Sequence, residues 1–410
     1  MKYLFTFLLF ALVTTATTAQ CNADLKPYTT GFDSLKASSF SFLDTALTDV
    51  KIVGYGEDTH GTAEFTVLAE ELMKYLSEKH DFKVLIIETG FGEGQYLNDY
   101  IHGKRDDLKT ILNKHNSTWR YRTKEFYQLM NWLKSYNKNN DDPIYIYGCE
   151  MQYVISDVNR IKAYLQKVNS DFPLEGFEKH LWQQIEESEK TAYYLSYARL
   201  KQHFIDNYEA FVAESSEKEF SMAYQHVAVL GQFVTAIIQH VEQRKRDFRD
   251  IYMEQNIEWI LNFHGTDAKA MYWAHNAHVG DWIDNGIVDV TGYQLRKRYG
   301  NYYYNIATDF GTGEFLAFSQ EGKMGTFGHK AVLEDTFTQC LQSFGKPNAF
   351  VNFRKAREDK KLSEFLNSRI TTMSGAGAQV RNSNTETKEL AKAFDGVIYL
   401  DKTTKINWAD

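Results

Sequence analysis

Residues 51–90 read KIVGYGEDTHGTAEFTVLAEELMKYLSEKHDFKVLIIETG, and their pattern decides the fold class. The first five residues are typical of a strand, and apolar residues from Phe65 to Leu76 then recur at helical spacing. The run VLII at 84–87 is typical of a strand buried on both faces. A strand, a helix and a second strand in such a short segment predict a βαβ unit, and therefore parallel pairing.

The same pattern returns further along the chain. Strands are predicted at 143–148, 270–274, 301–309, 348–353 and 396–401. The stretch from 154 to 265 has no convincing strand and is rich in Glu, Lys, Gln, Leu and Ala, which indicates several long helices. We therefore predict an α/β fold with a mostly parallel central sheet flanked by helices. A large helical insertion is expected to cover the carboxyl-end edge of the sheet.

This pattern also predicts how the chain is divided. Residues 1–19 are predicted to be a signal peptide, and residues 20–153 the first part of an α/β catalytic domain. The helical insertion, or lid, is placed at residues 154–265, and the second part of the catalytic domain at residues 266–410.

The first twenty residues, MKYLFTFLLFALVTTATTAQ, have the layout of a secretory signal peptide, with an early lysine, a short apolar core and small residues before a cut after Ala19. A lipoprotein anchored through Cys21 is the weaker alternative, because Gln20 stands where such sites carry a small residue. No later segment is long and apolar enough to suggest a membrane span. The mature protein is therefore predicted to be exported, either periplasmic or secreted.

The composition limits which partners the protein binds and how its fold is stabilised. The net charge of −8 and the pI near 5.9 argue against nucleic acid as the main partner. The chain has only three cysteines, so at most one disulfide can form within it and the apolar core must provide the stability. Neither the oligomeric state nor the presence of a disulfide follows from the sequence.

Ionisable residues follow the predicted strands one after another. In parallel sheets, ligands bind beyond the carboxyl ends of the strands, so groups placed there converge. Five predicted strands each deliver such a group, which is more than loop polarity alone would give. These residues are Glu57 and His60, Glu88, Glu150, His275 and His278, and Asp309.

Three segments that contain these ionisable residues resemble the erythromycin esterase family. They are G-E-x-x-H-G-T-x-E-F at 56–65, I-E-x-G at 87–90 and WAHNAHVGD at 273–281. The resemblance extends over most of the mature chain, through RDIYMEQNIEWIL at 249–261 to FDGVIYLD at 394–401. It implies hydrolysis of an ester or lactone by an activated water molecule, with no required metal or other cofactor.

The resemblance makes His60 the general base. Glu57, Glu88, His275 and His278 would then position that base, the water and the substrate carbonyl. The residue types agree with this chemistry, since histidine is the side chain whose pKa lies nearest neutral pH and a neighbouring carboxylate fixes its tautomer. No G-x-S-x-G motif is present, which makes a serine nucleophile of that type less favoured.

One position departs from the family pattern. The family has an arginine nine residues after the base, where this chain has Ala69. Arg120, Arg122 or Arg249 could supply the missing charge to the oxyanion or the substrate. We predict Arg120, Arg249 and Glu150 as substrate-binding residues. The natural substrate, including whether macrolides are hydrolysed, does not follow from the sequence.

Two other functions remain open. His60, His275, His278 and the glutamates could form the zinc site of a metal-dependent hydrolase. Alternatively, the helical insertion and the many aromatic residues would suit a non-catalytic periplasmic binding protein for a hydrophobic ligand such as haem.

Overall fold

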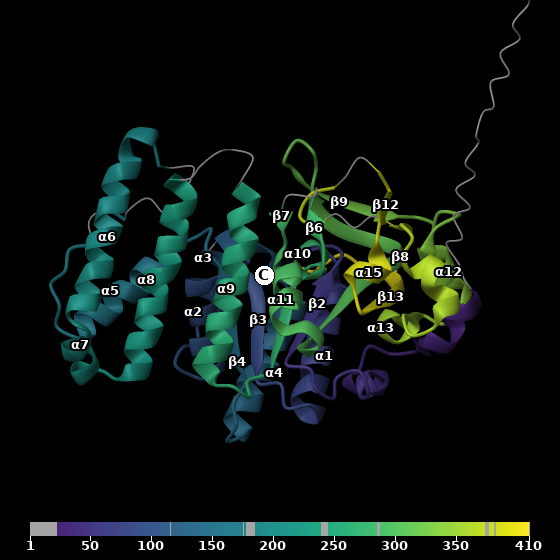
Figure 1. The fold of residues 1–410 in the computed structure, drawn as a ribbon, viewed down its shortest axis with the longest axis horizontal. Helices are drawn as coiled ribbons and strands as arrows, with labels where there is room; N and C mark the ends of the chain where they lie inside the picture. The colour runs from purple at the N-terminus through teal and green to yellow at the C-terminus, as the bar shows by residue number, and fades with distance from the viewer. Residues whose placement is uncertain are drawn as a thin grey trace, which may run out of the picture.

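The computed structural model of the protein describes residues 23–114, 116–174, 176–177, 185–238, 245–284, 288–373, 377–380 and 383–409. The predicted signal peptide lies outside the described residues. Figure 1 shows a sheet flanked by helices, with the helices that lie between β4 and β5 gathered on one side of it. Across the described residues, no helix combines the length and the apolar character that a membrane span requires.

A nine-stranded sheet runs through the described part of the chain, in the order β1, β10, β13, β8, β2, β5, β3, β4, with β9 paired to β8. The strands from β13 to β4 pair in parallel, which confirms the predicted class of fold. These parallel strands are β2 (Ile52–Glu57), β3 (Val84–Gly90), β4 (Tyr145–Glu150), β5 (Ala270–His275), β8 (Tyr303–Phe318) and β13 (Gly396–Thr403).

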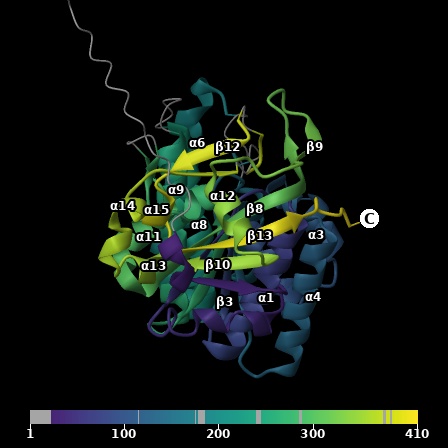
Figure 2. The same cartoon turned by 90° about the vertical axis from the view of Figure 1, so that its right-hand side faces the viewer.

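The far side of the sheet is antiparallel. Figure 2 shows β10 beside β13, with β8 next to β13. The predicted strand at 348–353 is β10, and it pairs antiparallel with both β13 and β1. The antiparallel strands are β1 (Thr29–Phe32), β9 (Met324–His329) and β10 (Asn348–Asn352). Two short hairpins are separate from the main sheet: β6 (Ile283–Asp284) with β7 (Val288–Asp289), and β11 (Ile370–Met373) with β12 (Thr385–Lys388).

Both faces of the sheet are buried, since the side chains that alternate along each strand enter two apolar clusters. In β3, Val84 and Ile86 belong to one apolar cluster, whereas Leu85 and Ile87 belong to the other. The second cluster packs against α1 (Ala63–Lys79) and α4 (Lys124–Asn139), while α2 (Phe91–Ile101) contributes to both clusters. A sheet covered on both faces explains why its strands are apolar throughout.

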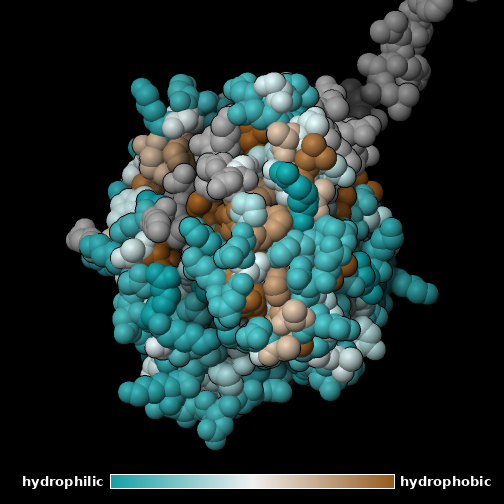
Figure 3. Space-filling model, turned by 90° about the vertical axis from the view of Figure 1, so that its left-hand side faces the viewer, coloured by the Kyte–Doolittle hydropathy of each residue, from teal (hydrophilic) through white to brown (hydrophobic). Residues whose placement is uncertain are grey.

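The chain between β4 and β5 is helical wherever it has regular secondary structure in the described residues. Its α-helices are α5 (Ile155–Lys167), α6 (Lys190–Asp206), α7 (Tyr208–Glu214), α8 (Glu217–Ile238) and α9 (Lys245–His264). They contribute to the first apolar cluster, and α9 contacts β4 directly. Seen from this side, the surface is mainly hydrophilic, with scattered apolar side chains (Figure 3).

The remaining helices are short and connect the strands. They are α3 (Leu108–Lys114), α10 (Asn276–Val279), α11 (Thr291–Tyr299), α12 (Phe337–Ser343), α13 (Phe353–Ala356), α14 (Ser363–Leu366) and α15 (Leu390–Ala393). A six-residue 3-10 helix, η4 (Asn116–Tyr121), precedes α4.

Candidate active site

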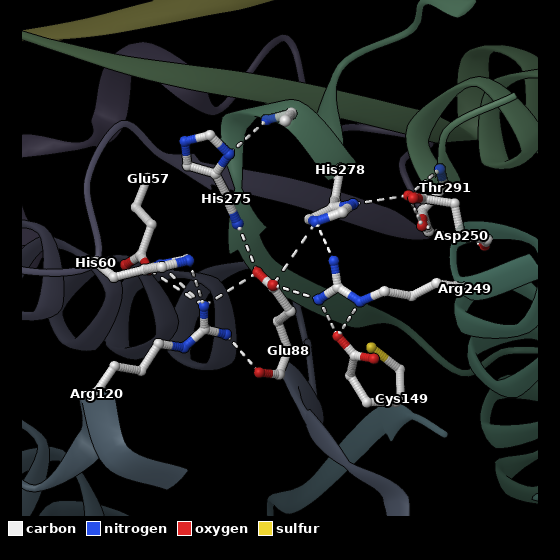
Figure 4. Close-up of polar contacts among 12 residues, drawn as sticks. Glu57, His60, Glu88, Arg120, Cys149, Arg249, Asp250, His275, His278 and Thr291 are labelled. Carbon is white, nitrogen blue, oxygen red and sulfur yellow. Dashed lines mark hydrogen bonds and ion pairs between the residues drawn. The ribbon is translucent and has the colours of Figure 1, made fainter. Parts of the chain in front are cut away.

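Four neighbouring parallel strands end at the same edge of the sheet and bring the predicted residues together. Glu57, Glu150 and His275 are the last residues of β2, β4 and β5, and Glu88 lies near the end of β3. His60 follows β2 in the loop before α1, and His278 lies in α10, directly after β5. Figure 4 shows Glu88 between His60 and His278, with Arg120 and Arg249 on either side of it.

The loop that carries His60 is fixed by distant parts of the chain. The backbone N–H of His60 donates to the carbonyl of Gly377 at 3.0 Å, and the N–H of Ile406 donates to the carbonyl of Gly61, also at 3.0 Å. A Cβ atom at Gly61 would overlap the backbone of Leu316, so only glycine fits after the histidine. Segments from the C-terminal third of the chain therefore position the predicted base.

Glu57 orients the His60 ring. The Nδ1 atom of His60 lies 2.5 Å from Oε1 of Glu57, while Oε2 of Glu57 accepts from the indole N–H of Trp273 at 2.8 Å. Since both carboxylate oxygens are engaged, the Glu57 side chain cannot rotate without losing a buried hydrogen bond. In the neutral ring, Nδ1 carries the proton that Glu57 accepts, and Nε2 is the basic nitrogen.

Arg120 lies against the face of the same imidazole. Its Nη1 atom is 2.9 Å from Nδ1 and 3.0 Å from Nε2 of His60, whereas a donor in the ring plane would approach only one of the two nitrogens. Burial and this guanidinium lower the pKa of His60 from its ordinary value, against Glu57, which raises it. His60 is therefore neutral at neutral pH, as a general base must be.

Glu88 joins two parts of the site, one around His60 and Arg120 and the other around His278 and Arg249. Its Oε2 accepts from Nη1 of Arg120 at 3.1 Å and from the backbone N–H of His275 at 2.9 Å. Its Oε1 accepts from Nη2 of Arg249 at 2.6 Å. Although burial favours the protonated form, Arg120, His278 and Arg249 together hold the pKa of Glu88 well below its usual range. Glu88 is thus an ionised carboxylate at neutral pH that holds two arginines in place, rather than a carrier of protons.

His275 is held in one neutral form. Its Nδ1 accepts from the backbone N–H of Ala277 at 3.2 Å, which caps α10, and its Nε2 lies 3.2 Å from the carbonyl of Asp58. Burial, together with His60 and His278, lowers the pKa of His275 well below its ordinary value. The ring centroids of His275 and His60 are 5.5 Å apart, so His275 is placed to line the site beside the base.

A second histidine–carboxylate pair lies on the other side of Glu88. Nδ1 of His278 is 2.8 Å from Oδ1 of Asp250, and Nε2 of His278 is 2.6 Å from Nη1 of Arg249. Arg249 also donates through Nε to Oε1 of Glu150 at 2.7 Å. Burial and the Arg249 guanidinium oppose the charged form of His278, but the Asp250 and Glu88 carboxylates outweigh them and raise the pKa of His278.

Asp250 is not among the site residues predicted from the sequence, and its bond to His278 is the main contact that sequence reasoning missed. The available signal was that Asp250 directly follows Arg249, so that one helix turn delivers both residues to the strand ends.

Two further predictions can be compared with the geometry. Of the three arginines considered as replacements for the absent family arginine, Arg120 and Arg249 reach the cluster, whereas Nε of Arg122 donates to the carbonyl of Leu112. Ala69 itself is buried in the apolar cluster between α1 and the sheet. The predicted strand at 301–309 is β8, which continues to Phe318, so Asp309 lies inside the strand and not at its end. Its side chain accepts from Oγ1 of Thr338 at 2.7 Å, and burial raises its pKa to about 7.

The predicted zinc ligands can also be compared with the geometry. Among the residues that the structure describes, no group of three or more histidine, cysteine, aspartate or glutamate side chains has a geometry that could hold a metal ion. The predicted ligands His60, His275 and His278 each direct Nδ1 to a protein group, namely Glu57, the N–H of Ala277 and Asp250.

Comparison with known proteins identifies the family. The erythromycin esterase family matches the chain over residues 77–403. The chain belongs to the erythromycin esterase family. Among its relatives is the erythromycin esterase type II of Escherichia coli, 23% identical over 89% of this chain and 92% of that protein.

Solved structures share the fold. A Bacillus cereus protein superposes with a TM-score of 0.83 at 22% identity, covering 96% of this chain and 99% of that one. A mutant of the erythromycin esterase EreC in its open conformation has a TM-score of 0.67 at 16% identity, covering 93% of this chain and 99% of that one. Family membership supports a hydrolase that acts on a small molecule, and the α/β fold with its flanking helices agrees with the prediction.

Proposed function

We propose that this member of the erythromycin esterase family is an exported carboxylic ester hydrolase that cleaves an ester or lactone with a water molecule activated by His60. One observation carries the proposal: the site holds two buried histidine–carboxylate pairs, and the pKa values of their histidines are shifted in opposite directions. Arg120 and burial favour neutral His60, whereas Asp250 and Glu88 favour protonated His278. Environments that push two pKa values apart mark the base and the acid of a hydrolytic site.

The proposed reaction uses His60 first, as the base, and His278 second, as the acid. Nε2 of His60 accepts a proton from water, and the resulting hydroxide attacks the carbonyl carbon. Arg120 and Arg249 are cations next to the site and would stabilise the charge that develops on the carbonyl oxygen. The carbon–oxygen bond of the ester then breaks, and the leaving oxygen takes a proton from Nε2 of His278. The products are the acid and the alcohol, or the hydroxy acid when the substrate is a lactone.

The pH dependence of hydrolysis tests this assignment. His60 must be unprotonated, so activity should rise with pH through its lowered pKa, on the acid side of the ordinary value of 6.5. His278 must be protonated, so activity should fall through its raised pKa, on the alkaline side of 6.5. We expect a bell-shaped profile of kcat/KM against pH whose two limbs lie on opposite sides of 6.5.

The measurement would use a panel of aryl esters, alkyl esters and lactones, with metal content determined on the same sample. A profile that falls on both sides of 6.5 supports the proposal. No hydrolysis of any panel member, or a profile with a single alkaline rise, would count against it. Hydrolysis that disappears when the protein is stripped of metal would favour the metal-dependent alternative.

Export is part of the proposal. The signal-peptide pattern of the first nineteen residues supports it. We expect the intact mass of protein from the extracytoplasmic fraction to correspond to a chain that begins at Gln20. A chain with lipid attached at Cys21 would show that the export route is different.

A further inference from the structure

Asp250 is bonded in a way that fixes its carboxylate. It is buried, and its Oδ1 accepts from the backbone N–H of Thr291 at 2.9 Å and from Oγ1 of Thr291 at 2.7 Å. The same oxygen lies 2.8 Å from Nδ1 of His278. With two hydrogen bonds from Thr291 at the first turn of α11, the Asp250 carboxylate offers His278 an acceptor of fixed position.

This contact determines where the second nitrogen of His278 points. Nε2 lies 2.6 Å from Nη1 of Arg249 and 3.7 Å from Oε1 of Glu88. At 2.6 Å, the Nε2 of a neutral ring accepts a hydrogen bond from Arg249. The charge of a protonated ring is offset by the Glu88 carboxylate, which at 3.7 Å forms an ion pair and not a hydrogen bond. His278 therefore has a partner for each protonation state, and the loss of a proton to a leaving group would be compensated by Arg249.

The side chain of His278 is also among the more accessible of the cluster. Its exposed fraction is 15%, against 6% for Glu88 and 5% for Asp250. A group of the substrate can reach His278 more readily than the two carboxylates that surround it. The Asp250 side chain is enclosed, so it can influence a substrate only through His278.

We propose that Asp250 is a positioning residue that holds His278 as the general acid of hydrolysis. The inference rests on the proposed function. Because Asp250 and Arg249 both belong to α9, the helical stretch between β4 and β5 supplies part of the catalytic machinery, in addition to packing against the sheet. A purely structural role for Asp250, as an anchor between α9 and α11, predicts different behaviour.

The positioning role and the purely structural role of Asp250 predict different dependences of kcat on the leaving group of the ester. An alkoxide needs a proton to leave, whereas a nitrophenolate leaves without one, so a general acid matters only for the alkyl ester. With esters of the same acyl group, Asp250→Asn should lose about a hundredfold in kcat on the alkyl ester and only a few-fold on the p-nitrophenyl ester. Its alkaline limb should move to lower pH, because an amide no longer favours protonated His278, while the acid limb stays in place.

Glu254→Gln is the matched control. Glu254 lies on the same helix, its side chain is 5% exposed like that of Asp250, and it bonds Arg298 at 2.6 Å instead of a site residue. Any loss of kcat in the Glu254→Gln variant should be the same for both esters. If Asp250→Asn does not fold, His278→Gln must show the same preference for the p-nitrophenyl ester. Equal losses on the two esters, or an unmoved alkaline limb, would overturn the role of Asp250 while wild-type hydrolysis still stands. A wild-type protein that hydrolyses neither ester would overturn the proposed function itself, and this inference with it.

Discussion

Replacing His60 with asparagine is expected to lower kcat by at least about a hundredfold while the protein stays folded. Asparagine can still donate a hydrogen bond toward Glu57, which now lies 2.5 Å from Nδ1 of the histidine. It has no group with a pKa near neutral, so it cannot take a proton from water. The activity that remains would come from the binding site and its two arginines alone.

The measurement compares kcat and the thermal unfolding midpoint of the variant with those of the wild type. His102→Asn is the matched control, because His102 is a partly buried histidine whose Nδ1 lies 2.8 Å from the carbonyl of Asn98, at the end of α2. This control should keep nearly all of the activity. Near-normal turnover in His60→Asn would remove His60 from the mechanism.

The sheet could be predicted because its strands follow simple rules. A strand buried on both faces has no polar positions, and VLII at 84–87 meets that condition. The parallel order then places the carboxyl ends of β2, β5, β3 and β4 side by side. The convergence of Glu57, Glu88, Glu150 and His275 follows from this order, with no knowledge of any side-chain contact.

The contacts inside the site could not be predicted, because they join residues far apart in the chain. Arg120 lies 60 positions from His60, and Arg249 lies 161 positions from Glu88. Nothing in the local pattern of either arginine distinguishes it from Arg122, which bonds a backbone carbonyl. The geometry also shows Ala69 packed inside an apolar cluster, where an arginine would be a buried charge that needs a partner.

The position of Asp309 shows another limit of the strand-end rule. The rule takes Asp309 as the end of a strand, whereas β8 continues to Phe318. In addition, alternate residues of a strand point to opposite faces. Ala307 belongs to the apolar cluster that α12 also joins, and Asp309, two positions later, bonds Thr338 of α12. Its carboxyl group therefore lies on that side of β8, and its hydrogen bond is with the helix and not with the residues around His60.

Replacing Glu88 with glutamine is expected to destabilise the fold on the order of 3–5 kcal/mol, because removing one partner of a buried ionic network leaves the other charges uncompensated. The Glu88 side chain is only 6% exposed, and it receives a hydrogen bond from Arg120, at 6% exposure, and from Arg249, at 19%. Glutamine has nearly the same shape, but its amide replaces an acceptor oxygen with a donor that faces a guanidinium. Denaturant unfolding at neutral pH measures the change. Glu258→Gln, which breaks a half-exposed ion pair with Arg298, should cost less than about 1 kcal/mol.

The pH dependence of stability separates the charge of Glu88 from its packing. Because the folded pKa of Glu88 is lowered, its stabilisation is complete above the ordinary value of 4.5 and is lost as pH falls through the folded pKa. The gap in unfolding free energy between wild type and Glu88→Gln should therefore be widest above pH 4.5 and should narrow on acidification. A gap that stays constant from neutral to acidic pH would mean that the loss comes from altered packing. Equal destabilisation by Glu88→Gln and Glu258→Gln would mean that Glu88 does not hold the two arginines together.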